Sequence, residues 1–566
     1  MLFNSKGREE VTYDAIVVGS GISGGWAAKE LTDKGLKTLV LDRGRNIKHG
    51  EYPTANWETW DAPLNGRNDY KEQMEHYPKQ SRTGYTTSQY TKHWFVKDSE
   101  HPYNEDKRFD WCRGYHVGGR SITWGRHVYR WSEMDFVANA KEGVAVDWPI
   151  RYKDIEPWYD YVEKYIGIQG TKEGLAQVPD AQFMGSFSLN CVEQHARERI
   201  KKSLGWTMTI GRTAHLTKPH KGRGKCQNRD RCIRGCPYGA YFSSQASTLP
   251  AAEVTGNMTL RPFSIVHSLI YDQATDKAIG VNVIDTETKE TFEYYAKVIF
   301  LCASTIASTS ILMNSKSERF ENGMGNDSGE LGHNLMDHHF MTGATADVDG
   351  YDDKYYKGRR PTGFYVARSS NLDHNSKKDY LRGFGYQGSA SRSGWGRAVA
   401  ELKAGPQFKD LMGTPGKWRM GMTAFAEMLP DHRNQMYLDY EKLDKWGIPT
   451  VTFDCENKEN EMAMRADMAN NAAEMLDASG FNNVQTYDNI GGPGLGIHEM
   501  GTARMGRDPK TSVLNANNAI HAVPNVYVTD GACMTSSACQ NPSITYMALT
   551  ARAVNHAVDQ INNNNI

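Results

Sequence analysis

Residues 13–42 read YDAIVVGSGISGGWAAKELTDKGLKTLVLD, and this stretch decides the fold. A β-branched run, Tyr13–Val18, ends in glycines and is followed by a helical stretch, Gly24–Lys34, with apolar residues on one face. A second apolar run, Thr38–Leu41, ends at Asp42. A strand, a turn, a helix and a strand within about 30 residues predict a Rossmann-like α/β domain.

The turn in this unit, GSGISG, has the form G-x-G-x-x-G. Gly19 permits the tight turn, Gly21 lets a pyrophosphate approach the backbone, and Gly24 lets helix and strand pack closely. Asp42 ends the second strand, where it can accept hydrogen bonds from an adenosine ribose, and Arg43 follows it. The motif predicts dinucleotide binding but does not separate FAD from NAD. A glycine-rich turn without a ligand is the alternative.

The bulk composition excludes several classes of protein. The 66 Lys and Arg residues nearly balance the 67 Asp and Glu residues, so no strong field favours nucleic acid or an anionic membrane. No apolar run reaches the roughly 18–20 residues that span a bilayer. The first ten residues, MLFNSKGREE, lack the apolar stretch of a signal peptide, which alone predicts the cytoplasm. Nine cysteines, an odd number, do not predict a disulfide scaffold.

Further motifs extend across the chain. They are GGRS at Gly118–Ser121, GHNLMDH at Gly332–His338, HEMGTARMG at His498–Gly506, VYVTDGA at Val526–Ala532 and NPSIT at Asn541–Thr545. Together with the N-terminal glycine turn, they resemble the glucose–methanol–choline (GMC) oxidoreductase family, whose members bind FAD and oxidise alcohols. The C-terminal segments therefore favour FAD over NAD.

The resemblance implies a discontinuous, Rossmann-like FAD-binding domain and an α+β substrate domain built on an antiparallel sheet. We assign residues 10–50, 105–130, 216–344 and 490–566 to the FAD domain (with a cysteine loop at 222–240), 51–104 to a loop-rich lid, and 131–215 and 345–489 to the substrate domain.

The resemblance also implies residues that hold FAD. They are Gly118, Gly119 and Ser121 beside the flavin or pyrophosphate, Val266 at the adenine through its backbone, Asp530 and Gly531 along the pyrophosphate and ribityl chain, and Asn541. Some family members attach FAD covalently through a histidine near the Gly-Gly segment, and His116 and His127 are the candidates here. We predict non-covalent FAD.

By the same resemblance, His498 is the catalytic acid/base and Asn541 is its partner. Oxidation of an alcohol removes an O–H proton and a C–H hydride. The reference pKa of histidine, about 6.5, lets a neutral imidazole accept the proton, and an amide can hold the substrate oxygen without titrating. A structural histidine and an ordinary Asn-Pro turn are the alternatives. We interpret His338 and His339 as structural residues near the FAD-domain boundary.

Three cysteines lie within eleven residues, Cys226, Cys232 and Cys236, in the pattern C-x5-C-x3-C-P. Closely spaced thiolates suit zinc or an iron–sulfur cluster. Zinc normally takes four ligands, for which His220 is the candidate. The segment resembles the one that binds a [3Fe–4S] cluster in the large subunits of bacterial sugar and gluconate dehydrogenases. We predict that cluster, and free thiols or zinc are the alternatives.

A cluster beside a flavin predicts a dehydrogenase rather than an oxidase, because a cluster passes single electrons to a protein acceptor of the cytochrome c type. Members of the subgroup work with a small companion subunit that can carry the export signal. The resemblance therefore implies a periplasmic location through that partner, whereas the chain alone predicts a cytoplasmic one.

The predicted substrate is a pyranose sugar or glucoside, oxidised at a secondary hydroxyl, with C3 as the first choice. Aromatic faces can pack against a pyranose, and the region from 345 to 425 supplies Tyr355, Tyr356, Phe364, Trp395 and Trp418. The alternatives are gluconate oxidation at C2, glucose oxidation at C1, a flavin sugar oxidase that uses dioxygen, and a non-catalytic flavoprotein that docks partners.

Overall fold

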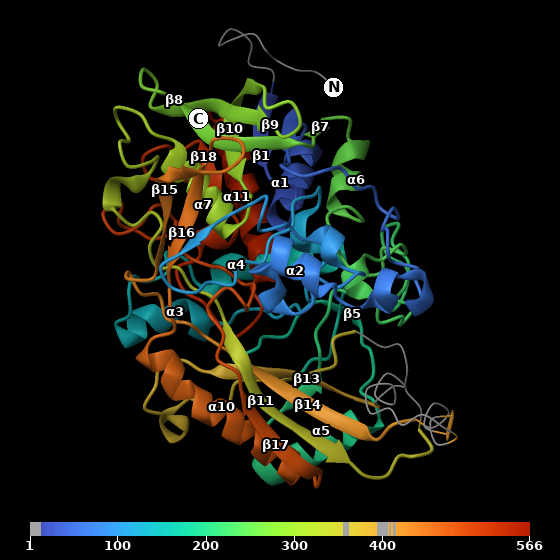
Figure 1. Ribbon diagram of the computed structural model, residues 1–566. Helices are drawn as coiled ribbons and strands as arrows, with labels where there is room; N and C mark the ends of the chain where they lie inside the picture. Colours follow the sequence, from blue (N-terminus) through green and yellow to red (C-terminus); the bar gives the residue numbers. More distant parts are fainter. Residues whose placement is uncertain (1–12, 355–360, 393–405, 407–408, 411–414) are drawn as a thin grey trace.

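The computed structural model describes residues 13–354, 361–392, 406, 409–410 and 415–566. Two sheets dominate the molecule, one above the other in Figure 1. The upper sheet carries the first strands of the chain, and the lower one is built from segments between residues 208 and 488. Tyr355, Tyr356 and Trp395, predicted to contact a sugar, lie outside the described residues.

The upper sheet has the order β7-β2-β1-β10-β9-β8, with β18 beside β10. Its strands are β1 (Tyr13–Val18), β2 (Thr38–Leu41), β7 (Met258–Arg261), β8 (Ser264–Asp272), β9 (Lys277–Asp285), β10 (Thr291–Leu301) and β18 (Val526–Val528). β7, β2, β1, β10 and β18 run parallel, whereas β9 pairs antiparallel with the first half of β10 and β8 pairs antiparallel with β9. β10 therefore belongs to both arrangements, and its second half is buried at the centre of the sheet.

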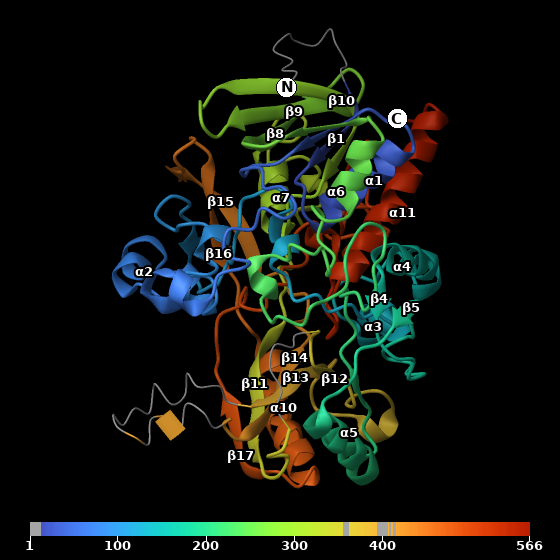
Figure 2. The ribbon, with the colours of Figure 1, turned by 90° about the vertical axis from the view of Figure 1, so that its right-hand side faces the viewer.

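Helices cover the parallel strands, which need burial on both faces. The long helices are α1 (Ile22–Asp33), α4 (Tyr152–Ile166), α7 (Thr305–Asn314) and α11 (Ser543–Asn562), and α6 (Thr248–Val254) is shorter. α1 packs against α11 and α6, and α11 packs against α4 (Figure 2). Among the described residues, no helix combines the length and apolar character that crossing a membrane would require.

The lower sheet has the order β17-β11-β14-β13-β12-β6, and all of its neighbouring strands are antiparallel. The strands are β6 (Met208–Ile210), β11 (His339–Val348), β12 (Phe364–Val366), β13 (Phe384–Arg392), β14 (Trp418–Ala426) and β17 (Asn482–Asp488), and α5 (Cys191–Leu204) and α10 (Glu459–Ala478) pack against them. Phe364 and Trp418 are fully buried in the core of this sheet. Their predicted contact with a sugar is therefore wrong.

A third, small sheet joins the stretch at 51–104 to the rest of the molecule. In it β15 (Gln435–Leu443) and β16 (Pro449–Asp454) form a hairpin, and β16 pairs with β3 (Asn104–Glu105). The stretch before β3, predicted to be a loop-rich lid, contains short helices: η1 (Thr59–Asp61), η2 (Pro63–Gly66), α2 (Tyr70–His76), η3 (Gln80–Thr83) and η4 (Lys92–Trp94). Figure 2 shows this stretch beside the hairpin.

The remaining elements are short connections. They are η5 (Gly119–Ile122), α3 (Glu133–Glu142), β4 (Ile168–Gln169), β5 (Phe183–Gly185), η6 (Cys232–Arg234), η7 (Asn326–Ser328), η8 (His374–Ser376) and η9 (Gly531–Cys533).

Candidate active site

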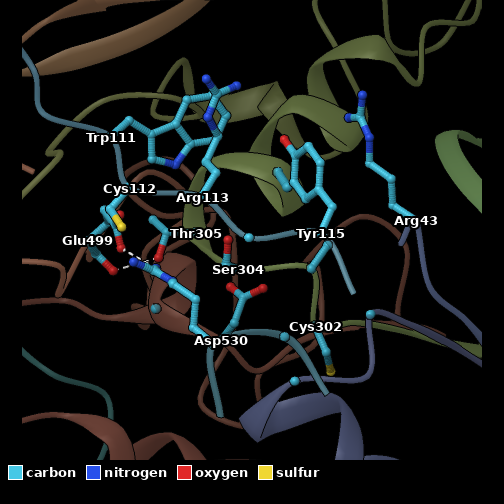
Figure 3. A pocket seen from close by; sticks show the side chains of 18 of the residues that line it. Arg43, Trp111, Cys112, Arg113, Tyr115, Cys302, Ser304, Thr305, Glu499 and Asp530 are labelled. Carbon is cyan, nitrogen blue, oxygen red and sulfur yellow. Dashed lines mark hydrogen bonds and ion pairs between the residues drawn. The ribbon is translucent and has the colours of Figure 1, made fainter. Parts of the chain in front are cut away.

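A cavity of about 310 Å³ lies at the carboxyl ends of β1, β10 and β18. This edge of a parallel sheet is where α/β folds bind their ligands. Of the predicted cofactor and catalytic residues, the cavity is lined by Gly19, Gly21, Asp42, Arg43, Gly119, Ser121, Val266, His498, Asp530, Gly531 and Asn541. Figure 3 shows Asp530, Tyr115 and Glu499 around it.

The glycine turn has the geometry that its motif demands. Gly19 adopts φ +93°, in the left-handed region that favours glycine. A Cβ on Gly24 would lie 1.9 Å from the carbonyl oxygen of Gly19, so this residue serves helix–strand packing and does not line the cavity. A Cβ on Gly21 would enter open space. The first amides of α1 therefore face a region that can receive a phosphate.

Gly118 differs from its expected role. Its Cβ would overlap the side chain of Gln245, and Gly118 is not among the residues that line the cavity. The predicted contact with the flavin or pyrophosphate therefore falls to Gly119 and Ser121. The side chain of Ser121 bonds to Ser244 at 3.0 Å, and the hydroxyl of Ser244 donates to the carbonyl oxygen of Ser20. These bonds connect the segment to the glycine turn before α1.

Asp42 is held rigidly at the end of β2. Its carboxylate accepts hydrogen bonds from the Ser20 hydroxyl and from the backbone amides of Ser20 (3.2 Å) and Gly44 (2.8 Å). Burial raises the pKa of Asp42 to about 6, and these hydrogen bonds oppose the rise. Its remaining lone pairs face the cavity, in the position that suits ribose hydroxyls.

Several buried polar atoms along the cavity find no partner among the described residues. They include Oε1 of Glu499, Nη1 of Arg120, Nε of Arg43 and the hydroxyl of Tyr546. Buried polar groups in folded proteins are normally hydrogen-bonded, so these atoms point to a polar ligand. With the glycine turn and Asp42, they fit FAD.

At one end of the cavity, His498 and Asn541 lie side by side. Nδ2 of Asn541 is 3.4 Å from Nε2 of His498. The two residues are 43 positions apart in sequence, and His498 is partly buried. The structure therefore brings together the two residues that the sequence selected, with their polar atoms facing each other.

His338 contacts the other side of the His498 ring, which its interpretation as a boundary residue missed. Nδ1 of His338 lies 2.8 Å from Nδ1 of His498, and Nε2 of His338 bonds to the carbonyl oxygen of Ala538. A carbonyl only accepts, so Nε2 of His338 carries its proton. Burial lowers the pKa of His338 to about 4, so Nδ1 is unprotonated and accepts the proton on Nδ1 of His498. Nε2 of His498 is then left with a free lone pair.

Asp337 fixes the backbone that carries His498. Its carboxylate accepts hydrogen bonds from the amides of Gly494 (2.8 Å), Gly496 (2.8 Å) and His498 (2.9 Å). Burial, followed by the charge of Glu499, raises the pKa of Asp337 to about 7. Asp337 and His338 come from one segment, so this segment positions both the backbone and the ring of His498.

Gln387, on β13 of the lower sheet, orients the amide of Asn541. Nε2 of Gln387 donates a hydrogen bond to Oδ1 of Asn541 at 2.7 Å. Because the oxygen is engaged, the NH2 group of Asn541 must face His498. No local pattern singles out Gln387, because only the packing of the two sheets brings it to the site.

The pH dependence of the first half-reaction follows from the environment of His498. Burial lowers its pKa well below 6.5, and His338, Arg120 and His127 lower it further. A base works when it is deprotonated, so a lowered pKa moves the loss of activity to more acidic solution. We expect the rate of flavin reduction by substrate to be flat from neutrality down to pH 6.5 and to fall only below it. A stopped-flow pH series measures this, and an inflection above pH 6.5 would contradict it.

The three cysteines of the 222–240 loop lie near one another, are partly exposed and take part in no disulfide. Burial raises the pKa of Cys226 to about 11, and the proximity of Cys232 and Cys236 raises it further. The carbonyl oxygen of Cys232 accepts a hydrogen bond of 2.6 Å from Arg126, which lines the cavity. Within the described ranges, no group of three or more His, Cys, Asp or Glu side chains has metal-binding geometry. The cluster therefore stays a prediction.

The surroundings of this loop bear on the alternatives. Nε2 of His220 bonds to the carbonyl oxygens of Lys164 (3.1 Å) and Tyr165 (3.0 Å), which does not support His220 as a zinc ligand. Three basic residues of the loop contact the 51–104 stretch: Arg231 pairs with Glu58, Arg229 bonds to Asn56, and Arg234 lies over Tyr90. The stretch therefore anchors the cysteine loop.

His116 and His127, the candidates for covalent attachment, both line the cavity. His116 is buried against Trp94, and burial lowers its pKa to about 4. Nδ1 of His127 lies 3.2 Å from the hydroxyl of Tyr129. Non-covalent FAD stays a prediction.

The parallel sheet, the glycine turn and a histidine–amide pair at the end of one cavity define a dinucleotide-dependent oxidoreductase. Sequence models described as GMC oxidoreductase match residues 13–340 and 430–550. The chain therefore belongs to the GMC oxidoreductase family, as the motifs predicted. It is an enzyme that acts on CH–OH groups, and its cofactor is FAD.

Individual relatives agree with this placement. The chain is 27% identical to 2-methyl-1,2-propanediol dehydrogenase of Mycolicibacterium austroafricanum, over 95% of this chain and 94% of that protein. It is 23% identical to the fructose dehydrogenase large subunit of Gluconobacter japonicus, over 98% and 99%. The solved structure of formate oxidase from Aspergillus oryzae superposes with a TM-score of 0.61 at 13% identity, covering 97% and 99%, which confirms the fold.

Proposed function

We propose that the enzyme is a dehydrogenase that oxidises a secondary hydroxyl of a pyranose sugar or glucoside, with C3 as the first candidate. The chain of hydrogen bonds from Ala538 through His338 to His498 carries the proposal. It fixes the tautomer of His498 so that Nε2 is the unprotonated nitrogen. This nitrogen faces Asn541 at the end of the cavity, where an alcohol has a base on one side and an amide donor on the other.

The chemistry divides between the protein and its cofactor. Nε2 of His498 accepts the proton of the substrate hydroxyl, and Asn541 donates a hydrogen bond that holds the substrate oxygen. Nδ1 of His498 stays bonded to His338, which keeps Nε2 as the nitrogen that accepts the proton. FAD, when bound, supplies the acceptor for the hydride that leaves the same carbon. Loss of one proton and one hydride converts the alcohol into a carbonyl compound.

Several polar groups support a sugar as the substrate. Gln387 bonds to Asn541, and His127 lies close enough to His498 to lower its pKa. The ion pair of Arg120 and Glu499, at 2.7 Å, lines the same cavity, and each partner has one buried atom without a hydrogen bond. Such groups can form hydrogen bonds with the several hydroxyls of a sugar, whereas a simple alcohol has only one or two hydroxyls to offer. The similarity to the large subunit of a fructose dehydrogenase supports the same class.

Anaerobic mixing of the flavin-loaded enzyme with glucosides, aldonates and free sugars, followed by product identification, tests the proposal. Bleaching of the flavin with a 3-keto product supports oxidation at C3. A 2-keto product from an aldonate would indicate oxidation at C2, and a lactone from glucose would indicate oxidation at C1. Either result would contradict C3 but support a sugar-type substrate. Bleaching by simple alcohols alone would contradict the sugar class.

We further propose that electrons leave through a [3Fe–4S] cluster held by Cys226, Cys232 and Cys236 to a cytochrome c-type acceptor. The spacing of the three thiols and the link from Cys232 through Arg126 to the cavity wall support this. A cluster, when bound, would supply one-electron transfer. A small companion subunit, supported by the large-subunit relative, would carry the complex to the periplasm.

The thiols provide a specific prediction. Changing Cys232 to serine is expected to lower the iron bound per flavin and to slow electron transfer to an added cytochrome c, because serine is a poor ligand for iron–sulfur clusters. The rate at which sugar reduces the flavin reports on a different step and serves as the internal comparison. Iron analysis and two-step stopped-flow measurements check this. Purified wild-type protein that carries flavin without iron and produces peroxide rapidly would favour an oxidase.

A further inference from the structure

The turn of the β15–β16 hairpin, residues 444–448, lies against the wall of the cavity. Asp444 and Ile448 line the same cavity as Asp42 and Val266. Asp42 follows β2 in the position that binds an adenosine ribose. The hairpin therefore reaches the adenosine half of the FAD site, although it belongs to the segment assigned from sequence to the substrate domain.

Arg43 connects the hairpin to this site. Its guanidinium lies over the ring of Tyr115 at 4.5 Å and over the ring of Trp446 at 4.8 Å, and Nη2 is 3.4 Å from Oδ2 of Asp444. Nε of Arg43 is buried and has no partner among the described residues. The rings of Tyr115 and Trp446 and the carboxylate of Asp444 thus hold the guanidinium of Arg43, whose Nε–H remains available for a ligand.

The turn is itself firmly anchored. Oδ1 of Asp444 accepts hydrogen bonds from the amides of Trp446 (2.9 Å) and Ile448 (3.0 Å). Nε1 of Trp446 bonds to the carbonyl oxygen of Thr286 at 3.1 Å, and the ring of Trp446 stacks on His101 at 5.4 Å. Three segments that are distant in sequence therefore meet around Arg43.

We propose that this turn is a clasp that retains FAD by its adenosine half. Asp444 and Trp446 fix the guanidinium of Arg43, and Arg43 offers its N–H donors to the adenosine ribose and phosphate oxygens. Trp446 does not line the cavity and acts through Arg43, so it is a positioning residue. The glycine turn and Asp42 bind the same half of the cofactor from the other side, and the clasp closes the site on the side of the hairpin.

Release of FAD from the holoenzyme tests the clasp. Bound FAD is followed by the rise in free-flavin fluorescence after dilution into buffer without FAD. We expect Trp446→Ala and Arg43→Ala each to release FAD about ten times faster than the wild type, the order expected for a lost, partly buried cation–π contact. The double variant should be no faster than Arg43→Ala, because both changes remove the same contact.

Two further variants separate the clasp from a general loss of structure. Trp446→Phe keeps an aromatic face for Arg43 and should release FAD at close to the wild-type rate. Glu441→Ala changes an exposed residue of the same hairpin and should have no effect. Release from Trp446→Ala at the wild-type rate, or equally fast release from Trp446→Phe and Trp446→Ala, would overturn the proposal. No substrate is present, so the outcome is independent of the proposed sugar oxidation.

Discussion

Alanine in place of His498 is expected to slow flavin reduction by substrate by about 10²–10⁴-fold, the usual contribution of a general base. The structure leaves Nε2 of His498 as the unprotonated nitrogen beside Asn541. Without it, the substrate hydroxyl has no partner to accept its proton while the hydride leaves. Anaerobic stopped-flow absorbance measures the rate, and the flavin content of the purified protein shows that FAD is still bound.

His432→Ala is the matched control for this change. His432 is an exposed imidazole that stacks on His333, away from the cavity. Its replacement should leave the reduction rate unchanged. If His498→Ala reduced its flavin as fast as the wild type, another residue would be the base, and the chain would fit the non-catalytic docking subunit.

Leucine in place of His338 is expected to slow flavin reduction by about 10²-fold, near the lower limit for losing a general base. Leucine cannot accept the proton on Nδ1 of His498, so this proton can move to Nε2 and occupy the catalytic lone pair. His338 acts through His498, which makes it a positioning residue.

Two readouts distinguish this role from a packing defect. His338→Gln supplies an amide oxygen that can accept from His498, and it should recover most of the rate. His338 also lowers the pKa of His498, so its removal should raise that pKa and move the acid limb of the pH profile to higher pH. Equal rates in the leucine and glutamine variants, with an unmoved acid limb, would show that His338 only fills space.

The local motifs of the chain could be predicted because their physics is local. The strands predicted at Tyr13–Val18 and Thr38–Leu41 have the same bounds in the structure. The helix between them begins at Ile22 rather than Gly24, because the backbone of Gly21 already serves as its N-cap. Such positions are specified by turn geometry and by the ligand, and neither requires distant segments.

The contacts that orient His498 and Asn541 could not be predicted in this way. His338 and His498 are 160 residues apart, and Gln387 and Asn541 are 154 apart. Each pair meets only after the two sheets pack, so no periodicity or spacing reveals it. The Asp-His dipeptide at 337–338 was the available signal. Two adjacent titratable residues in a buried segment need polar partners. In the structure, the segment that contains His498 supplies them.

The two described aromatic residues that were predicted to contact a sugar belong instead to the core. Phe364 and Trp418 occur in a region that composition marks as aromatic, yet both point into the core of the lower sheet. Burial of large apolar side chains is the more common use of such residues. The polar residues around His498 are the better indication of what binds there.

The most direct test of the account is the reduction of the flavin by a sugar that carries deuterium at the carbon to be oxidised. The account predicts that the unlabelled sugar bleaches the flavin under anaerobic conditions and that the deuterated sugar does so more slowly. The sugar that lacks the hydroxyl at the same carbon should not react. A flavin that stays oxidised with every sugar tested, while His498 and Asn541 are intact, would contradict it.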